Sequence, residues 1–124
     1  MLYTHVQRNV SHTPRKLRLI VDMVKKMEPS EAVEVLSFTN KLAAPTLAKA
    51  IKSALANAAK KDSLRFEKIE INEGLKMKRY LEGTAGRGRG RPFKRRLSHI
   101  KIVLTDEISK ASLQAKGEQR GTKN

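Results

Sequence analysis

The sequence predicts an α+β fold: a small globular body of three helices packed on a short antiparallel sheet, with a long protruding basic β-hairpin. Two observations lead to this prediction. Apolar residues follow helical spacing in the first half of the chain and alternate with polar residues in the second half. The two alternating runs flank a stretch rich in Gly and Arg, GTAGRGRGRPFKRR at 83–96, so we expect them to pair as the arms of one hairpin.

The N-terminal region predicts an extended segment followed by a helix. Tyr3–Val10 alternates only roughly, which suits a short edge strand or an extended arm. Thr13 then provides a capping acceptor, and Pro14 stands at the first helical position, where its missing N–H is harmless. We expect this helix to stop before Pro29. Its buried stripe consists of Leu17, Ile20, Val21 and Val24.

Two further helices are expected before residue 62. Ser30 is placed to cap a short second helix, with Glu31 in the first turn, where the helix dipole favours negative charge. A third helix is expected over Lys41–Lys61, with Pro45 either in its true first turn or at a kink. The residues expected to face inward are Ala32, Val33 and Leu36 in the second helix, and Leu47, Ile51, Ala54, Leu55 and Ala58 in the third.

Strand periodicity begins after the third helix. From Ile69 the apolar residues fall on odd numbers (Ile69, Ile71, Leu75 and Met77), whereas Leu64 and Phe66 have the opposite parity. A bulge is therefore expected near Glu67-Lys68. Ile100, Ile102 and Leu104 alternate again beyond the Gly/Arg stretch. The predicted hairpin spans 69–104, with arms Ile69–Tyr80 and Phe93–Leu104 and its tip at 81–92.

The charge of the chain points to a polyanionic partner. Its 124 residues hold 27 Lys and Arg against 12 Asp and Glu, a formal charge of +15. Ten of these cations and only one acid, Glu82, lie between Lys76 and Lys101, a net +9. Charge runs are usually solvated surfaces, but a projecting ribbon with like charges on both faces repels itself unless a polyanion neutralises it. We therefore expect the hairpin to bind nucleic acid.

Several classes of function find no support in the sequence. There is no cysteine, and the three histidines share no metal-ligand spacing with a carboxylate, so neither a metal site nor a cofactor is expected. No P-loop or nucleophile elbow is present, and we expect a protein that is not an enzyme. No apolar run approaches the roughly 18 residues of a membrane span. We expect one domain over residues 1–111 and a disordered tail over 112–124.

Two local features leave alternatives open. Ser98 and His99 stand at the start of the returning strand, where either could bond a phosphate or cap the local backbone. The segment Arg89-Gly90-Arg91-Pro92 reads like an AT-hook, which would make the chain a minor-groove DNA-binding protein. AT-hooks normally lie in disordered flanks, however, and here the segment falls between two alternating runs.

Four segments in order resemble the bacterial type of the ribosomal large-subunit protein twenty-two family, over about residues 5–106. They are SHTPRKLRL at 11–19 with Asp22, SALANA at 53–58, Glu73-Gly74 with Met77-Lys78-Arg79, and RRLSHI at 95–100. The tip departs from the family, because Leu81-Glu82-Gly83 and a Gly/Arg repeat replace its usual stretch. Leu97 also stands where Thr is usual.

The resemblance implies a cytoplasmic protein of the large ribosomal subunit. Its body would lie near the exit of the nascent-peptide tunnel, and its hairpin would thread inward to line the tunnel. Its partners would be several domains of the large-subunit ribosomal RNA, neighbouring ribosomal proteins and the nascent peptide, with no membrane or small-molecule substrate. We expect it to aid assembly by bridging RNA domains.

The expected RNA-binding residues come from the resemblance and from the charge pattern. On the body, the resemblance implies Arg15, Lys16 and Arg18; on the hairpin it implies Lys78, Arg79, Arg95, Arg96, Ser98 and His99. The charge of the hairpin adds Lys76, Arg87, Arg89, Arg91 and Lys94. We expect Gly86, Arg87, Gly88, Arg89 and Gly90 to form the tip that lines the tunnel, where glycine lets the backbone approach a partner closely.

Overall fold

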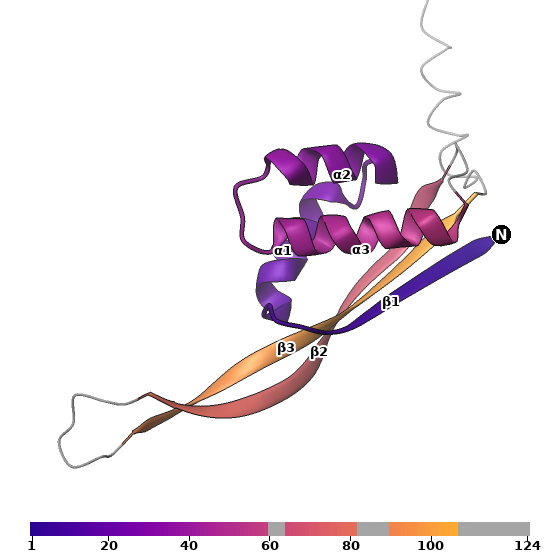
Figure 1. Ribbon diagram of the computed structural model, residues 1–124. Helices are drawn as coiled ribbons and strands as arrows, with labels where there is room; N and C mark the ends of the chain where they lie inside the picture. Colours follow the sequence, from indigo (N-terminus) through magenta and orange to yellow (C-terminus); the bar gives the residue numbers. More distant parts are fainter. Residues whose placement is uncertain (60–63, 82–89, 107–124) are drawn as a thin grey trace, which may run out of the picture.

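The computed structural model describes residues 1–59, 64–81 and 90–106. They form a three-stranded antiparallel sheet in the order β1-β3-β2, with the helices gathered on one face (Figure 1). The predicted α+β fold is confirmed. Beyond the helices, β2 and β3 continue together as a long projecting hairpin (Figure 1). The elements are β1 (Leu2–Val10), α1 (Pro14–Val24), α2 (Pro29–Phe38), α3 (Ala44–Asn57), β2 (Arg65–Leu81) and β3 (Arg91–Thr105).

The core lies between the helices and the central strand, β3. Ile100, Ile102 and Leu104 alternate along β3 and are fully buried, as their period of two predicted. Each such side chain stabilises the fold by about 1.5–3 kcal/mol relative to an exposed one. From the helices the core receives Leu17, Ile20, Val21, Val24, Ala32, Leu36, Leu47, Ile51 and Ala54, and Ala58 joins it just after α3; Val33 and Leu55 are partly buried against it.

The first helix starts where Pro14 predicted, but Thr13 caps it differently. The Thr13 side chain makes no capping hydrogen bond. Its carbonyl oxygen instead accepts the first backbone bonds, from the N–H groups of Lys16 at 3.1 Å and Leu17 at 3.3 Å. The helix ends at Val24, a few residues before Pro29. Extended backbone at Thr13 and a proline in the first turn therefore define this end without a side-chain cap.

The starts of the other two helices differ from prediction. The capping role expected of Ser30 is wrong, since α2 begins at Pro29 and Glu28 occupies the position before it. The third helix covers Ala44–Asn57, which is shorter than Lys41–Lys61, with Pro45 in its first turn. In both helices proline takes an early position, because a backbone N–H at that point would have no helical partner and its absence from proline costs nothing.

The sheet contains three irregularities, and only one of them was predicted. The register shifts between Phe66 and Lys68, as the change of parity indicated, and β2 begins before this bulge rather than at Ile69. A second shift in β2 falls between Glu73 and Lys76. The third lies between Gln7 and Val10 of β1, which is an edge strand as expected. The second shift corrects the prediction that one parity holds from Ile69 to Met77.

Parts of two sequence predictions lie outside the described residues. The structure does not describe residues 82–89, which include most of the expected tip, or residues 112–124, the expected tail. The hairpin is therefore described here up to Leu81 on one arm and from Gly90 on the other.

Candidate nucleic-acid interface

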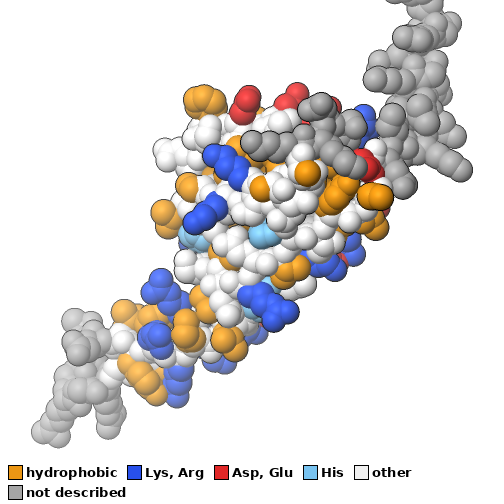
Figure 2. Space-filling model, turned by 45° about the vertical axis from the view of Figure 1, so that its right-hand side comes forward, with side chains coloured by type: hydrophobic (Ala, Val, Ile, Leu, Met, Phe, Trp, Pro, Cys, Tyr) orange, Lys and Arg blue, Asp and Glu red, His pale blue; other side chains and the backbone are white. Residues whose placement is uncertain are grey.

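The outer hairpin, defined here as Lys76–Leu81 of β2 and Arg91–Arg96 of β3, carries a dense positive charge. Its cations are all exposed, and these two segments contain no Asp or Glu. Figure 2 shows Lys and Arg together with apolar side chains on this projection, whereas the acidic side chains visible on the same face lie on the body. The cations are Lys76, Lys78, Arg79, Arg91, Lys94, Arg95 and Arg96.

A single described carboxylate lies where the outer hairpin joins the body. Lys76 Nζ is 2.7 Å from a Glu73 carboxylate oxygen. The side-chain hydrogen bond from Lys76, followed by the charge of the same lysine, lowers the pKa of Glu73. Arg18 and Arg96 add weaker attraction to this carboxylate. Among the described residues beyond this point toward the tip, no carboxylate faces the cations, which remain available to phosphates.

Apolar and aromatic side chains are interleaved with these cations. Leu81 is 58% exposed, Tyr80 63% and Phe93 41%, whereas Leu97, Ile100, Ile102 and Leu104 of β3 are buried. The Lys78 ammonium lies 5.2 Å from the centre of the Tyr80 ring, within range of a cation–π contact. Exposed rings beside Lys and Arg are typical of surfaces that stack on unpaired bases.

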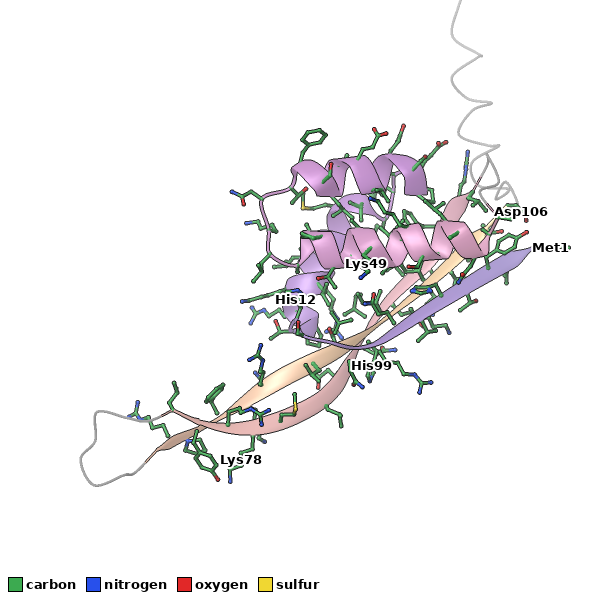
Figure 3. The ribbon with its side chains drawn as sticks, in the orientation of Figure 1. Met1, His12, Lys49, Lys78, His99 and Asp106 are labelled. Atoms are coloured by element: carbon green, nitrogen blue, oxygen red, sulfur yellow. The ribbon has the colours of Figure 1, made fainter. Side chains whose placement is uncertain are left out.

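Three of the predicted site residues tie the hairpin to the body. Arg18 of α1 donates from Nε and Nη2 to the Ile71 carbonyl oxygen in β2, at 3.3 and 2.9 Å. Ser98 is fully buried, and its hydroxyl donates to the His12 carbonyl oxygen at 2.8 Å. His99 Nδ1 accepts the Asn9 backbone N–H at 3.0 Å. Figure 3 shows His99 where β1 crosses the base of the hairpin and His12 near the start of α1.

These contacts favour one of the two alternatives for Ser98 and His99, the local backbone bond. Ser98 has no exposed surface to offer a phosphate. His99 is half-buried, and its Nδ1 is already engaged as the acceptor of the Asn9 N–H. Asn9 itself lies in the left-handed region, with φ of 55°, which Asn tolerates better than most residues.

The remaining predicted residues divide between the body and the tip. Arg15 and Lys16 are exposed on α1, and Lys16 borders a hollow of about 380 Å³ with apolar walls that include Leu19, Met23 and Leu42. Gly90 is half-buried, and a Cβ there would meet the Leu81 carbonyl oxygen at 3.1 Å. Gly86, Arg87, Gly88 and Arg89 lie outside the described residues.

The described residues contain no group of three or more His, Asp or Glu side chains placed to hold a metal ion. In the same part of the chain no helix is both long enough and apolar enough to cross a membrane.

Sequence reasoning missed the bulge at Gly74-Leu75, although a glycine inside an alternating run is a known sign of one. A Cβ at Gly74 would lie 3.2 Å from His99 Cε1 and from the backbone C and O of Leu97. The close approach of β3 therefore favours glycine here, because the Leu97 backbone would have to move by a few tenths of an ångström to admit a side chain. Leu75, which parity placed with Ile71, is 63% exposed as a result.

The family model of ribosomal protein L22p/L17e matches residues 5–105 of this chain. The chain belongs to this family. Among similar proteins named large ribosomal subunit protein uL22, one from Phytoplasma sp. (strain STRAWB2) is 37% identical, over 96% of this chain and 94% of its own. The protein of that name from Macrococcus caseolyticus is 36% identical, over 93% and 96% of the two chains. The protein of that name from Oceanobacillus iheyensis is 36% identical, over 82% of this chain and 93% of its own. The resemblance inferred from the sequence is confirmed.

Proposed function

We propose that this L22p/L17e-family chain is a structural constituent of the large ribosomal subunit, working in the cytoplasm without catalysing a reaction. It binds large-subunit ribosomal RNA mainly through the outer hairpin. The observation that carries the proposal is a projecting ribbon whose exposed cations face no carboxylate among the described residues beyond Glu73. RNA phosphates relieve the repulsion among these cations, and the released counterions add to the affinity.

The hairpin bridges RNA domains because it extends past the body. From Lys76 to Leu81 the strand advances about 17 Å at roughly 3.4 Å per residue. The ribbon therefore reaches RNA that the body does not touch, while Arg15 and Lys16 on α1 are exposed to contact RNA at the body. We treat residues 1–111 as one unit, in which Arg18, Ser98 and His99 hold body and hairpin in a fixed relation.

The tip, from Gly86 to Gly90, lines the tunnel through which the nascent peptide leaves. Support comes from β2 and β3, which run together away from the helices up to Leu81 on one strand and from Arg91 on the other (Figure 1). A Gly88→Cys variant in ribosomes is expected to crosslink to a stalled nascent chain. A cysteine at Lys49, on α3 of the body, is expected not to (Figure 3).

The first test is sedimentation of cell extract in moderately high salt. We expect the protein at near one copy per particle in the large-subunit and whole-ribosome fractions. Lys78→Glu with Lys94→Glu, a directly opposed pair, should deplete it from those fractions. Lys49→Glu with Lys52→Glu makes the same change in charge at two exposed lysines of α3, and this variant should remain in the large-subunit and whole-ribosome fractions. Wild-type protein that stays at the top of the gradient would refute the proposal.

The AT-hook alternative is disfavoured by the register. Arg91 and Pro92 belong to β3 and pair with Leu81 and Tyr80, so half of this motif is part of the hairpin's strand. A DNA-binding protein would prefer an AT-rich duplex over ribosomal RNA in direct competition and lose that preference in Arg91→Ala.

A further inference from the structure

The two faces of the outer hairpin carry different chemistry. In an antiparallel pair, directly opposed residues point to the same face and neighbours along a strand point to opposite faces. One face, the lysine face, therefore holds Lys76, Lys78, Tyr80, Pro92, Lys94 and Arg96. The other, the arginine face, holds Met77, Arg79, Leu81, Arg91, Phe93 and Arg95.

Two side-chain contacts support this division independently of the register. Lys78 lies over the ring of Tyr80, two residues on along the lysine face. Arg79 Nη2 lies 3.7 Å from the sulfur of Met77, two residues back along the arginine face. Both contacts run between residues i and i+2, as a regular strand requires.

The division depends on the bulge at Gly74-Leu75. Before it, Ile69 and Ile71 pair with Ile102 and Ile100, on the side of the sheet that the helices cover. Between the pairs Glu73–Ser98 and Lys76–Arg96, β2 uses one residue more than β3. The lysine face therefore continues the helix-covered side, and Met77 with its arginine neighbours turns to the open side.

All three lysines of the outer hairpin lie on the lysine face. Three of its four arginines lie on the arginine face, together with its Met, Leu and Phe residues (Met77, Leu81 and Phe93). A lysine ammonium is a strongly hydrated point charge that suits phosphates. An arginine guanidinium is planar and weakly hydrated, and it stacks on bases as well as bonding them. Phe93 and Leu81, both exposed, add apolar surface on which a base can lie.

We propose that the two faces recognise RNA differently: the lysine face binds the phosphate backbone, and the arginine face binds unstacked bases. This inference rests on the proposed RNA-binding function and adds a site for bases to it. On the lysine face, Tyr80 is the exposed ring, and the Lys78 ammonium already covers one side of it.

The test compares the same conservative substitution on the two faces. The probe is full-length large-subunit ribosomal RNA transcribed from the organism's own gene, with binding measured over a series of KCl concentrations. Arg79→Lys with Arg95→Lys keeps the charge of the arginine face and removes its planar groups. Arg96→Lys makes the same kind of change on the lysine face, where Arg96 is also exposed. Arg8→Lys with Arg65→Lys, two exposed arginines outside the outer hairpin, is the matched control. Circular dichroism checks that each variant folds.

We expect the arginine-face variant to bind about ten-fold more weakly with an unchanged salt dependence, because stacking involves no counterion release. Arg96→Lys should weaken binding by less than about two-fold, because lysine keeps the charge that a phosphate contact needs. Arg8→Lys with Arg65→Lys should bind as wild type does. Lys78→Gln with Lys94→Gln should instead reduce the slope of log affinity against log salt by about 1.4–1.8, roughly 0.7–0.9 per phosphate contact. Phe93→Leu should lower affinity without changing the slope.

Two results would overturn the inference in distinguishable ways. If wild-type protein shows no salt-dependent binding to the transcript, the proposed function itself is wrong. If wild type binds but the arginine-face variant is indistinguishable from Arg96→Lys, RNA binding stands and the division between faces is wrong. A neighbouring ribosomal protein would then be the better candidate for the open side of the hairpin.

Discussion

Replacing Ser98 by alanine separates a structural role for this residue from an RNA-binding one. Its hydroxyl is fully buried and donates to the His12 carbonyl oxygen at 2.8 Å, joining β3 to the segment that leads into α1. Alanine fits the same space but leaves that carbonyl without the bond. The substitution should therefore lower the free energy of unfolding and leave the RNA affinity of the folded protein unchanged.

The magnitude follows from the cost of a partly buried acceptor that loses its donor. Such a loss costs about 1–2 kcal/mol for neutral groups. For a chain of this length, a change of 1 kcal/mol shifts the melting temperature by roughly 3–5 °C. We expect Ser98→Ala to melt roughly 3–10 °C below wild type. Replacing Ser98 by threonine keeps the hydroxyl but adds a methyl group at a position with no solvent-exposed surface.

Thermal unfolding followed by circular dichroism measures the effect, and filter binding to ribosomal RNA measures the affinity. Ser37→Ala is the matched control, because Ser37 is exposed and its hydroxyl bonds only the Glu34 carbonyl oxygen within α2. The control should melt within about 1 °C of wild type, a small change typical of exposed sites. A Ser98→Ala protein of wild-type stability and reduced RNA affinity would refute the reasoning.

Three further predictions concern the body and its junction with the hairpin. Arg18→Met should lower stability by about 1 kcal/mol, since it removes both hydrogen bonds to the Ile71 carbonyl oxygen; urea unfolding with no change would contradict this. Ile100→Ala should cost about 2–5 kcal/mol and Ile100→Val about 0.5–1.5, because the side chain is fully buried; equal melting temperatures for the two variants would argue against that packing. Lys76 lowers the pKa of Glu73, so this pair stabilises the fold above the ordinary value of 4.5 and loses its effect as the pH falls through the lowered pKa. The stability difference between wild type and Glu73→Gln should accordingly vanish on acidification, and a difference that grows at low pH would be inconsistent with the pairing.

Elements whose side chains alternate between core and solvent were predictable from the sequence. Leu17 and Val24 follow the period of a helix and are both fully buried, and Ile100 and Ile102 follow the period of a strand and are also fully buried. In each case burial of one face is what sets the period. The parity change before Ile69 revealed the first bulge for the same reason, since it moves apolar residues to the other position of the repeat.

Features that depend on a partner segment were not predictable in this way. Ser30 has the chemistry of a cap, but α2 begins one residue earlier, at a proline whose ring is buried in the fold. Ser98 and His99 have groups suited to phosphates, and the structure directs them to the backbones of His12 and Asn9. Side-chain chemistry specifies what a residue can bind, while the approach of another segment decides which partner it meets.

The sequence by itself determined that this chain is an α+β protein of the L22p/L17e family with a basic hairpin, because periodicity, charge and motif order are written in consecutive residues. Only the tertiary structure decided how that charge is divided. Where β3 approaches closely at Gly74, β2 carries one extra residue, and the side chains beyond it exchange faces. A side-chain period of two makes the consequence large, since a shift of one residue turns every following side chain to the opposite side of the ribbon.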